Sequence, residues 1–158
     1  MIKLVLLDID GVLTNGRVTV DSEGKEYKTI DFKDIDAVFE MKRQKLLVGL
    51  MTGEATPITR YFKERFEPDF FYSGCKHKDE ALREILAKTG LSVENVCYVG
   101  DAKYDISVMK LVKFSACPSN AIPEVKALAG IQLEARGGEG CVWELLKWMT
   151  DKEMYDRR

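Results

Sequence analysis

The chain has 158 residues, of which 46% are hydrophobic and 32% are charged, which is enough apolar material for one domain with a hydrophobic core. Its formal net charge of −2 offers no excess of cations to neutralise a phosphate backbone, so nucleic acid is not expected as a partner. No cationic segment followed by an apolar stretch opens the chain, and no apolar run approaches a membrane span. We therefore expect a single cytoplasmic domain over residues 1–158, without membrane contact.

Strands and helices alternate along the chain. An apolar run at 3–8 suits a strand covered on both faces, and two segments rich in Val, Thr, Tyr and Ile, at 17–21 and 26–32, suit a hairpin that turns near Gly24. Further strands are expected at 46–51, 69–72, 95–100 and 113–117, and helices around 35–42, after the Thr56–Pro57 start signal, and near 78–89, 103–112, 121–129 and 140–149. This alternation predicts an α/β fold, a Rossmann-like three-layer sandwich with a mainly parallel sheet.

Polar residues follow three of the predicted strands. Asp8 and Asp10 end the first, Thr52–Gly53–Glu54 end the second, and Gly100–Asp101 end the third, with Asp105 shortly after. In such a fold ligands bind beyond the carboxyl ends of the strands. Carboxylates that converge there repel one another unless protons or a cation neutralise them, and their oxygens suit Mg²⁺. The pattern therefore predicts a magnesium site at this edge.

Four short motifs resemble those of the haloacid dehalogenase superfamily of phosphatases. "DIDGVLT" at residue 8 is similar to its first motif, D-x-D-G-[VT]-[LI]-T, and Thr52 in "MTG" is similar to the second. Lys78 resembles the third, and "GDAKYD" at residue 100 resembles the fourth, G-D-x-x-x-D. Each motif alone is weak, but all four occur in the right order.

The resemblance implies a role for each matched residue. Asp8 would be the nucleophile that forms an aspartyl-phosphate, and Asp10 the general acid and base. Because side chains two apart on a strand point to opposite faces, the chain must turn after Asp8, and Gly11 is consistent with that turn. Thr52 would donate to a phosphoryl oxygen and Gly53 would let the backbone approach it.

The remaining matched positions concern charge. Lys78 would stabilise the transferring phosphoryl group, and Asp105 would orient Lys78 or a metal-bound water. Asp101 would bind Mg²⁺ together with a carboxylate oxygen of Asp8 and the backbone carbonyl of Asp10. Relatives often carry G-D-D in the fourth motif, where this chain has Ala102, so metal affinity here could be weaker. Each of these residues alone would also suit a purely structural position: the aspartates in a loop cap, Thr52 in a turn and Lys78 on a solvated helix face.

The chain has no room for a cap domain. Thr14–Leu46 is long enough only for a hairpin and one helix, and Gly53–His77 only for a helix and a short strand. The hairpin, the helix after it and the "RGGEG" segment at residue 136 resemble the capless sugar-acid phosphatases, typified by 3-deoxy-manno-octulosonate 8-phosphate phosphatase. The resemblance implies a homotetramer assembled through the hairpins, acting on a small phosphorylated sugar acid.

Two features bear on the substrate. Octulosonate enzymes usually show T-G-R or S-G-R where this chain has Glu54, and Arg136 with Gly137 and Gly138 precedes the last helix. The combination looks more like phosphatases of nonulosonates, such as 2-keto-3-deoxynononate 9-phosphate or N-acetylneuraminate 9-phosphate, with the octulosonate as the alternative. Arg136 suits a sugar carboxylate. It suits a solvated loop equally, and Glu54 equally suits a helix start favoured by the dipole.

A non-enzymatic role is the rival class. A response-regulator receiver also places aspartates, a threonine and a lysine around magnesium on a parallel sheet, and a phosphate-binding signalling module would share that chemistry. A receiver would not need Asp10 as an acid, so "DIDG" speaks against that alternative. Catalytic release of phosphate separates these classes from a phosphatase.

Overall fold

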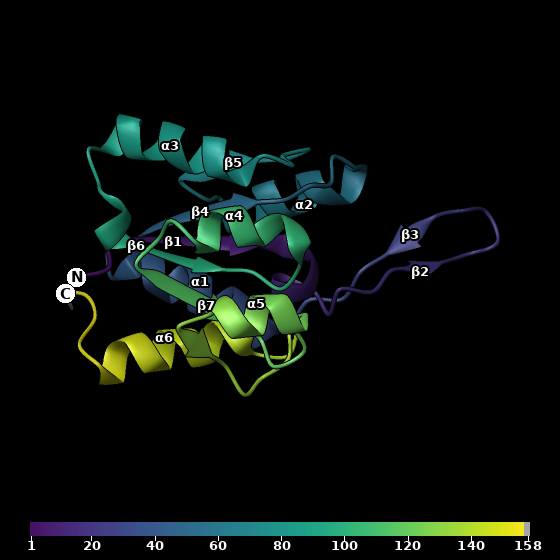
Figure 1. Cartoon of the computed structure of the whole chain (residues 1–158). Coiled ribbons are helices and arrows are strands. Elements are labelled where there is room, and N and C mark those ends of the chain that lie inside the picture. The colour runs from purple at the N-terminus through teal and green to yellow at the C-terminus, as the bar shows by residue number, and fades with distance from the viewer. Residues whose placement is uncertain (157–158) are drawn as a thin grey trace.

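A single twisted sheet forms the middle of the computed structural model, which describes residues 1–156 (Figure 1). Its six strands lie in the order β5-β4-β1-β6-β7-β8, and every pairing is parallel. Their bounds are β1 Leu4–Asp8, β4 Leu47–Met51, β5 Phe70–Tyr72, β6 Val96–Val99, β7 Phe114–Cys117 and β8 Ile131–Gln132. The strands that follow β1 in sequence add first on one side of it (β4, β5) and then on the other (β6, β7, β8). Strand β1 therefore lies in the interior of the sheet, where both of its faces are covered.

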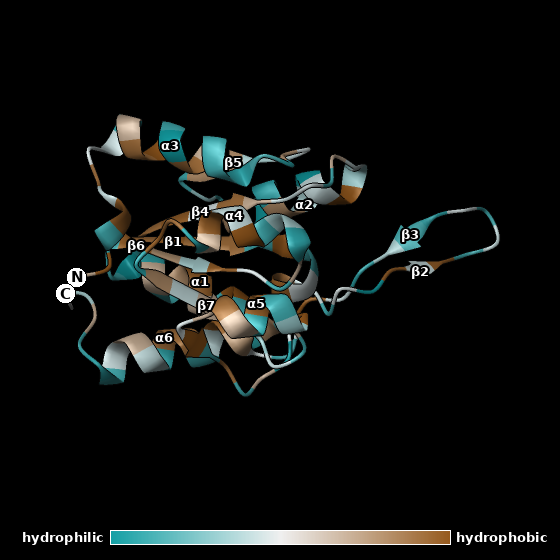
Figure 2. Ribbon diagram, viewed as in Figure 1, coloured by the Kyte–Doolittle hydropathy of each residue, from teal (hydrophilic) through white to brown (hydrophobic). Residues whose placement is uncertain are grey.

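Helices cover both faces of the sheet, which confirms the predicted three-layer α/β sandwich. One face packs against α1 Phe32–Arg43, α2 Pro57–Phe66 and α6 Cys141–Asp151, and the other against α3 Lys78–Thr89, α4 Ile106–Met109 and α5 Pro123–Leu128. Side chains alternate along β1: Val5 and Leu7 point into the first core, Leu4 and Leu6 into the second. Figure 2 shows the same pattern, with hydrophobic strands inside and hydrophilic outer helix faces.

A hairpin projects from the sandwich as a thin arm (Figure 1). Only β2 Thr19–Val20 and β3 Glu26–Tyr27 pair in it, so the strands expected at 17–21 and 26–32 were too long. The turn lies where it was expected, with Gly24 in a left-handed conformation (φ 79°) and its N–H donated to the Asp21 carbonyl. The arm packs on no layer of the sandwich, and strand propensity alone does not extend the pairing.

Two other elements differ from expectation. The helix expected at 103–112 is a 3₁₀ turn, Lys103–Asp105, followed by the short α4, because the Asp105 carboxylate accepts the N–H groups of Asp101 and Ala102 and tightens the chain there. The edge strand β8 was not expected, since it has only two residues.

The remaining elements lie within a few residues of their expected bounds. Thr56 is the N-cap of α2 and Pro57 its first residue, as the start signal indicated. Among the described residues, no helix is both long enough and apolar enough to cross a bilayer.

Candidate active site

The chain turns sharply where β1 ends. Residues Ile9–Leu13 form a π-helical turn in which Gly11 has a φ of 90°, a conformation that side chains rarely adopt. A Cβ atom at Gly11 would also lie 1.9 Å from Oδ2 of Asp101. Glycine therefore allows both the turn expected after Asp8 and the close approach of the fourth-motif aspartate.

A buried lysine connects two of the predicted site residues. Nζ of Lys78, the first residue of α3, donates to Oδ1 of Asp8 at 2.8 Å and to Oδ1 of Asp105 at 2.7 Å, and the lysine side chain is 2% exposed. Asp105 also accepts the Tyr98 hydroxyl at 2.5 Å and the backbone N–H of Asp101 at 2.9 Å. Protein donors thus occupy both oxygens of Asp105, which holds Lys78 against Asp8.

The site carries more negative charge than Lys78 neutralises. Burial, and after it the charge of Asp105, raises the pKa of Asp8 well above its usual range. Burial, with the charge of Asp105, also raises the pKa of Asp101 to about 6. Burial lowers the pKa of Lys78, but the two carboxylates beside it outweigh that effect and raise it. The site therefore favours an additional proton or a bound cation.

The donor atoms fit a metal ion. Asp8, Asp101 and Asp105 each offer a carboxylate oxygen within 4.8 Å of the others. Over residues 1–156, Oδ1 of Asp101 is the buried side-chain oxygen that has no hydrogen-bond partner, and such an atom costs about 1–3 kcal/mol unless a ligand satisfies it. Protein donors occupy both oxygens of Asp105 but only Oδ1 of Asp8, so Asp8 and Asp101 are the carboxylates that keep an oxygen for a hard divalent ion.

The second acid of the first motif has a partner that sequence reasoning missed. Nζ of Lys28 lies 2.8 Å from both Oδ1 and Oδ2 of Asp10, and the Thr14 hydroxyl donates to Oδ1 at 3.1 Å. Lys28 stands just after β3, eighteen residues from Asp10 in sequence. No local pattern marks it, because the contact depends on how the arm leaves the sandwich.

A cavity of about 290 Å³ opens over this edge of the sheet. Its lining brings most of the predicted residues together and adds Lys76 and Tyr104, which were not predicted: Asp8, Asp10, Thr52, Gly53, Glu54, Lys76, Lys78, Ala102, Tyr104 and Asp105. The parallel register explains the convergence, since Asp8 pairs with Met51 and so ends level with Thr52. The Thr52 hydroxyl accepts the Glu54 N–H at 3.1 Å and holds this loop at the rim.

The predicted Arg136, Gly137 and Gly138 do not line this cavity. The Arg136 side chain is 52% exposed and lies 3.8 Å from Glu139. A Cβ atom at Gly137 would lie 1.8 Å from the carbonyl oxygen of Gly11, and the N–H of Gly138 donates to Val12 at 2.8 Å. Within one chain these two glycines pack against Ile9–Leu13, the turn that carries Asp10 and that we call the catalytic turn for its predicted role.

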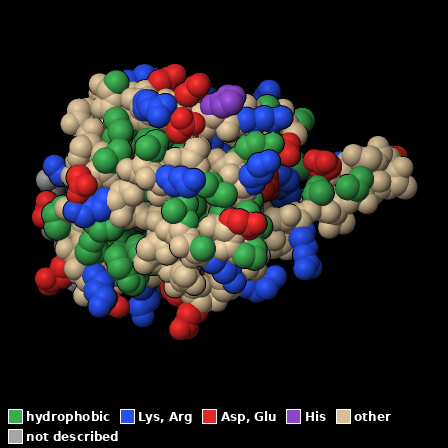
Figure 3. Space-filling view, viewed as in Figure 1, with side chains coloured by type: hydrophobic (Ala, Val, Ile, Leu, Met, Phe, Trp, Pro, Cys, Tyr) green, Lys and Arg blue, Asp and Glu red, His purple; other side chains and the backbone are tan. Residues whose placement is uncertain are grey.

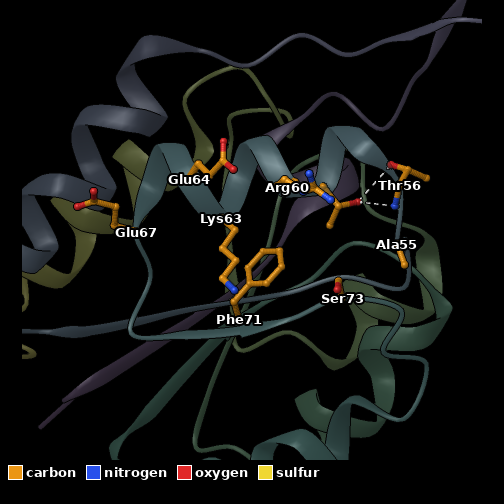
Figure 4. Close-up of a pocket in the computed structure, with 9 residues that line it drawn as sticks. Ala55, Thr56, Arg60, Lys63, Glu64, Glu67, Phe71 and Ser73 are labelled. Carbon is orange, nitrogen blue, oxygen red and sulfur yellow. Dashed lines mark hydrogen bonds between the residues drawn. The ribbon is translucent and has the colours of Figure 1, made fainter.

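A larger cavity, of about 920 Å³, lies between α2 and the edge strand β5 (Figure 4). Charged side chains of both signs from α2 line it, among them Arg60, Lys63, Glu64 and Glu67, and Phe71 of β5 lies below them. None of the four motifs contributes a residue to it. The smaller cavity over the aspartates is therefore the candidate active site.

The chain is similar to known phosphatases in sequence and in fold. The chain is 29% identical to 3-deoxy-D-manno-octulosonate 8-phosphate phosphatase of Escherichia coli K12, over 91% of this chain and 77% of the relative. Among solved structures, the same enzyme of Yersinia pestis matches with a TM-score of 0.90 and 25% identity over 96% of this chain and 83% of its own. The cobalt-bound deoxy-D-mannose-octulosonate 8-phosphate phosphatase of Haemophilus influenzae matches with a TM-score of 0.90 and 25% identity over 97% and 90%.

These relatives indicate a phosphatase rather than a signalling module. The family model for haloacid dehalogenase-like hydrolases matches residues 57–144, which is more than half of the chain. The match begins after the first motif and includes Lys78 and Asp101. The chain therefore belongs to the haloacid dehalogenase-like hydrolases.

Proposed function

We propose that this chain hydrolyses the phosphomonoester of a keto-deoxy sugar acid, with Mg²⁺ and through an aspartyl-phosphate. One observation carries the proposal: a buried lysine holds Asp8 at the bottom of an open cavity, beside an aspartate with an unsatisfied buried oxygen. A carboxylate nucleophile, a fixed cation and a carboxylate oxygen available to a metal ion are what transfer of a phosphoryl group to an enzyme requires.

The residues divide the reaction between them. A carboxylate oxygen of Asp8 attacks phosphorus while the bond from phosphorus to the leaving oxygen breaks, and Asp10 gives that oxygen its proton. Asp10 then takes a proton from water, whose oxygen attacks phosphorus and releases Asp8. Lys78 offsets the charge of the phosphoryl oxygens, and the Thr52 hydroxyl and the Gly53 backbone are placed to contact them.

The metal supports both steps. Asp8 and Asp101 would hold Mg²⁺ with the backbone carbonyl of Asp10, and the ion would offset the charge that Lys78 leaves uncompensated. The orphaned oxygen of Asp101 supports this assignment, as does the cobalt in the Haemophilus influenzae relative. Ala102 stands where relatives often carry a second acid in the fourth motif, and its backbone N–H donates to Asp105. Asp101 is therefore the carboxylate of this motif that offers a free oxygen to the metal.

Glu54 favours a nonulosonate 9-phosphate over the octulosonate 8-phosphate. It lines the cavity at its exposed rim, where its carboxylate would accept hydrogen bonds from the additional hydroxyl or amide groups of a longer sugar chain. The names of the curated relatives favour the octulosonate instead. In either case Arg136 would meet the substrate carboxylate from a neighbouring subunit, since its side chain is outside the cavity of its own chain, and Gly137 and Gly138 would support it from their packing on the turn after β1.

Assembly would complete the site. The arm and its base expose the apolar side chains Val18, Val20, Tyr27 and Phe32, the last 72% exposed, and Figure 3 shows hydrophobic side chains along the arm. Water-exposed apolar surface of this kind favours association. We propose that arms from four copies pair into a homotetramer, which light scattering would detect and which a monomer at working concentration would contradict.

The test of substrate class is a comparison of kcat/KM. Octulosonate 8-phosphate, nonulosonate 9-phosphates and a hexose 6-phosphate are assayed with Mg²⁺, on the wild type and on Glu54→Arg. We expect the nonulosonates to lead in the wild type and the preference to move toward the octulosonate in the variant. Equal kcat/KM on all three substrates would contradict the sugar-acid assignment, and a wild-type lead of the octulosonate would contradict the finer one.

A further inference from the structure

Lys28 reaches the active site from outside the elements that carry the motifs. It stands at the base of the arm, yet its side chain is only 11% exposed, because it turns back onto Asp10. Its Nζ lies 2.8 Å from each carboxylate oxygen of Asp10, so one ammonium group contacts both. An ammonium is a flexible point charge, and holding it in one geometry costs side-chain entropy that this contact must offset.

The backbone around this contact is fixed. Thr14 is fully buried and pairs with Ile30, which ties the base of the arm to the end of the catalytic turn. The Thr14 hydroxyl donates to Oδ1 of Asp10 and accepts the N–H groups of Gly11 and Gly16. Because Thr14 and Lys28 both donate to Oδ1, Oδ2 is the less occupied oxygen of Asp10.

We propose that Lys28 is a positioning residue, which holds the Asp10 carboxylate so that Oδ2 faces the leaving oxygen of the substrate. This inference rests on the proposed function, in which Asp10 is the acid. As Asp8 forms its bond to phosphorus and the bond to the leaving oxygen breaks, the proton on Oδ2 passes to that oxygen. Without Lys28 only the Thr14 hydroxyl would orient the Asp10 carboxylate, whose side chain is 29% exposed.

Leaving groups of different basicity test this role. A 4-nitrophenolate leaves without a proton, whereas the alkoxide of a sugar phosphate needs one. The ratio kcat/KM reports only steps up to the departure of the leaving group, so the later role of Asp10 as a base does not enter it. We expect Lys28→Met to lower kcat/KM for the sugar-acid phosphate by about 10- to 100-fold and that for 4-nitrophenyl phosphate by less than about threefold.

Three comparisons keep the outcome decisive. Lys28→Arg keeps the cation and should restore much of the loss, while Lys25→Met, at the exposed turn of the same arm, should change neither substrate. In a double-mutant cycle, Lys28→Met should add nothing to Asp10→Asn, because Lys28 acts through Asp10. Thermal unfolding and light scattering of each variant report whether the fold and assembly persist.

The failures are distinguishable. If Asp10→Asn shows the leaving-group dependence and Lys28→Met shows equal losses on both substrates, or none, this inference is overturned and the proposed function stands. If Lys28→Met is additive to Asp10→Asn, Lys28 acts elsewhere and the inference is again overturned. If Asp10→Asn loses equally on both substrates, the acid assignment falls, and the role of Lys28 falls with it.

Discussion

Asp34 and Asp101 are both acidic side chains in the interior, but their surroundings differ. Asp34, on α1 and 1% exposed, accepts backbone N–H groups at the start of α6, from Gly140 at 3.0 Å, Val142 at 2.9 Å and Trp143 at 3.2 Å. Both of its oxygens are satisfied. Asp101 keeps one buried oxygen without a partner. A fully bonded carboxylate holds the architecture together, whereas an incompletely bonded one keeps a position for a ligand.

The two regions are connected through the backbone. The chain that enters α6 from Gly138 to Gly140 packs on the catalytic turn, where the N–H of Gly138 donates to Val12. Asp34 thus anchors, from α1, the segment that supports the turn carrying Asp10. We expect changes at Asp34 to alter stability and changes at the site to alter catalysis.

The largest effect is expected at Asp8. Asp8→Asn removes the nucleophile but keeps the shape, and Lys78 retains its contact with Asp105. Turnover of the best sugar-acid phosphate should fall by at least about 10³-fold, while the melting temperature without metal stays equal or rises, because a repelling charge is lost. Near-normal turnover with Mg²⁺ would show that Asp8 is not the nucleophile.

Asp101 comes next. Asp101→Asn removes a charged ligand at the orphaned position, so the Mg²⁺ concentration for half-maximal activity should rise at least about tenfold, and the thermal stabilisation by added Mg²⁺ should shrink. Glu124→Gln, an exposed acid on α5, is the control and should change neither. An unchanged Mg²⁺ titration in Asp101→Asn would place the metal elsewhere.

Asp34 provides the opposite case. Asp34→Ala leaves the first N–H groups of α6 without an acceptor and should lower the free energy of unfolding by about 2 kcal/mol, as denaturant titration measures. Below the melting transition the Mg²⁺ dependence of activity should stay near that of the wild type. Asp36→Ala, an exposed acid on the same helix, should cost little. Equal stability of the Asp34 and Asp36 variants would contradict the anchoring role.

Whether a feature of the fold or the site could be predicted from the sequence depends on how far apart along the chain the contacting residues are. Asp8 is the last residue of β1, Thr52 follows β4 directly, and Asp101 comes two residues after β6. Parallel strands bring their carboxyl ends to one edge of the sheet whatever the conformation of the loops. The three layers were also predictable, because a chain in which apolar strands alternate with amphipathic helices has few stable ways to bury its apolar faces.

The missed residues act through contacts that no local pattern encodes. The Lys28–Asp10 pair spans eighteen residues, and the bond from Gly140 to Asp34 spans 106. Tyr98 lies in the strand expected at 95–100 and is fully buried, but its hydroxyl donates to Asp105, a contact that the strand pattern does not indicate. Propensity likewise overestimated the strands of the arm, since it does not report whether a partner layer is present.

The smallest effect is a pH dependence that separates the two acids further. The pKa of Asp101 rises from its ordinary value of 3.8 to about 6 in the fold, so between these values the native state binds more protons than the unfolded chain. Its contribution to stability is therefore complete below about pH 4 and is lost as pH rises to about 6. Asp8, whose pKa is also raised, acts in the same direction. With EDTA present, wild-type stability should fall more steeply with pH than that of Asp101→Asn across this range, as measured by thermal unfolding at each pH. Saturating Mg²⁺ should remove the difference in the wild type, because the metal binds the ionised carboxylate and favours its charged form. If the wild type and Asp101→Asn lost stability equally with pH in EDTA, the pKa of Asp101 would not be raised in the folded protein.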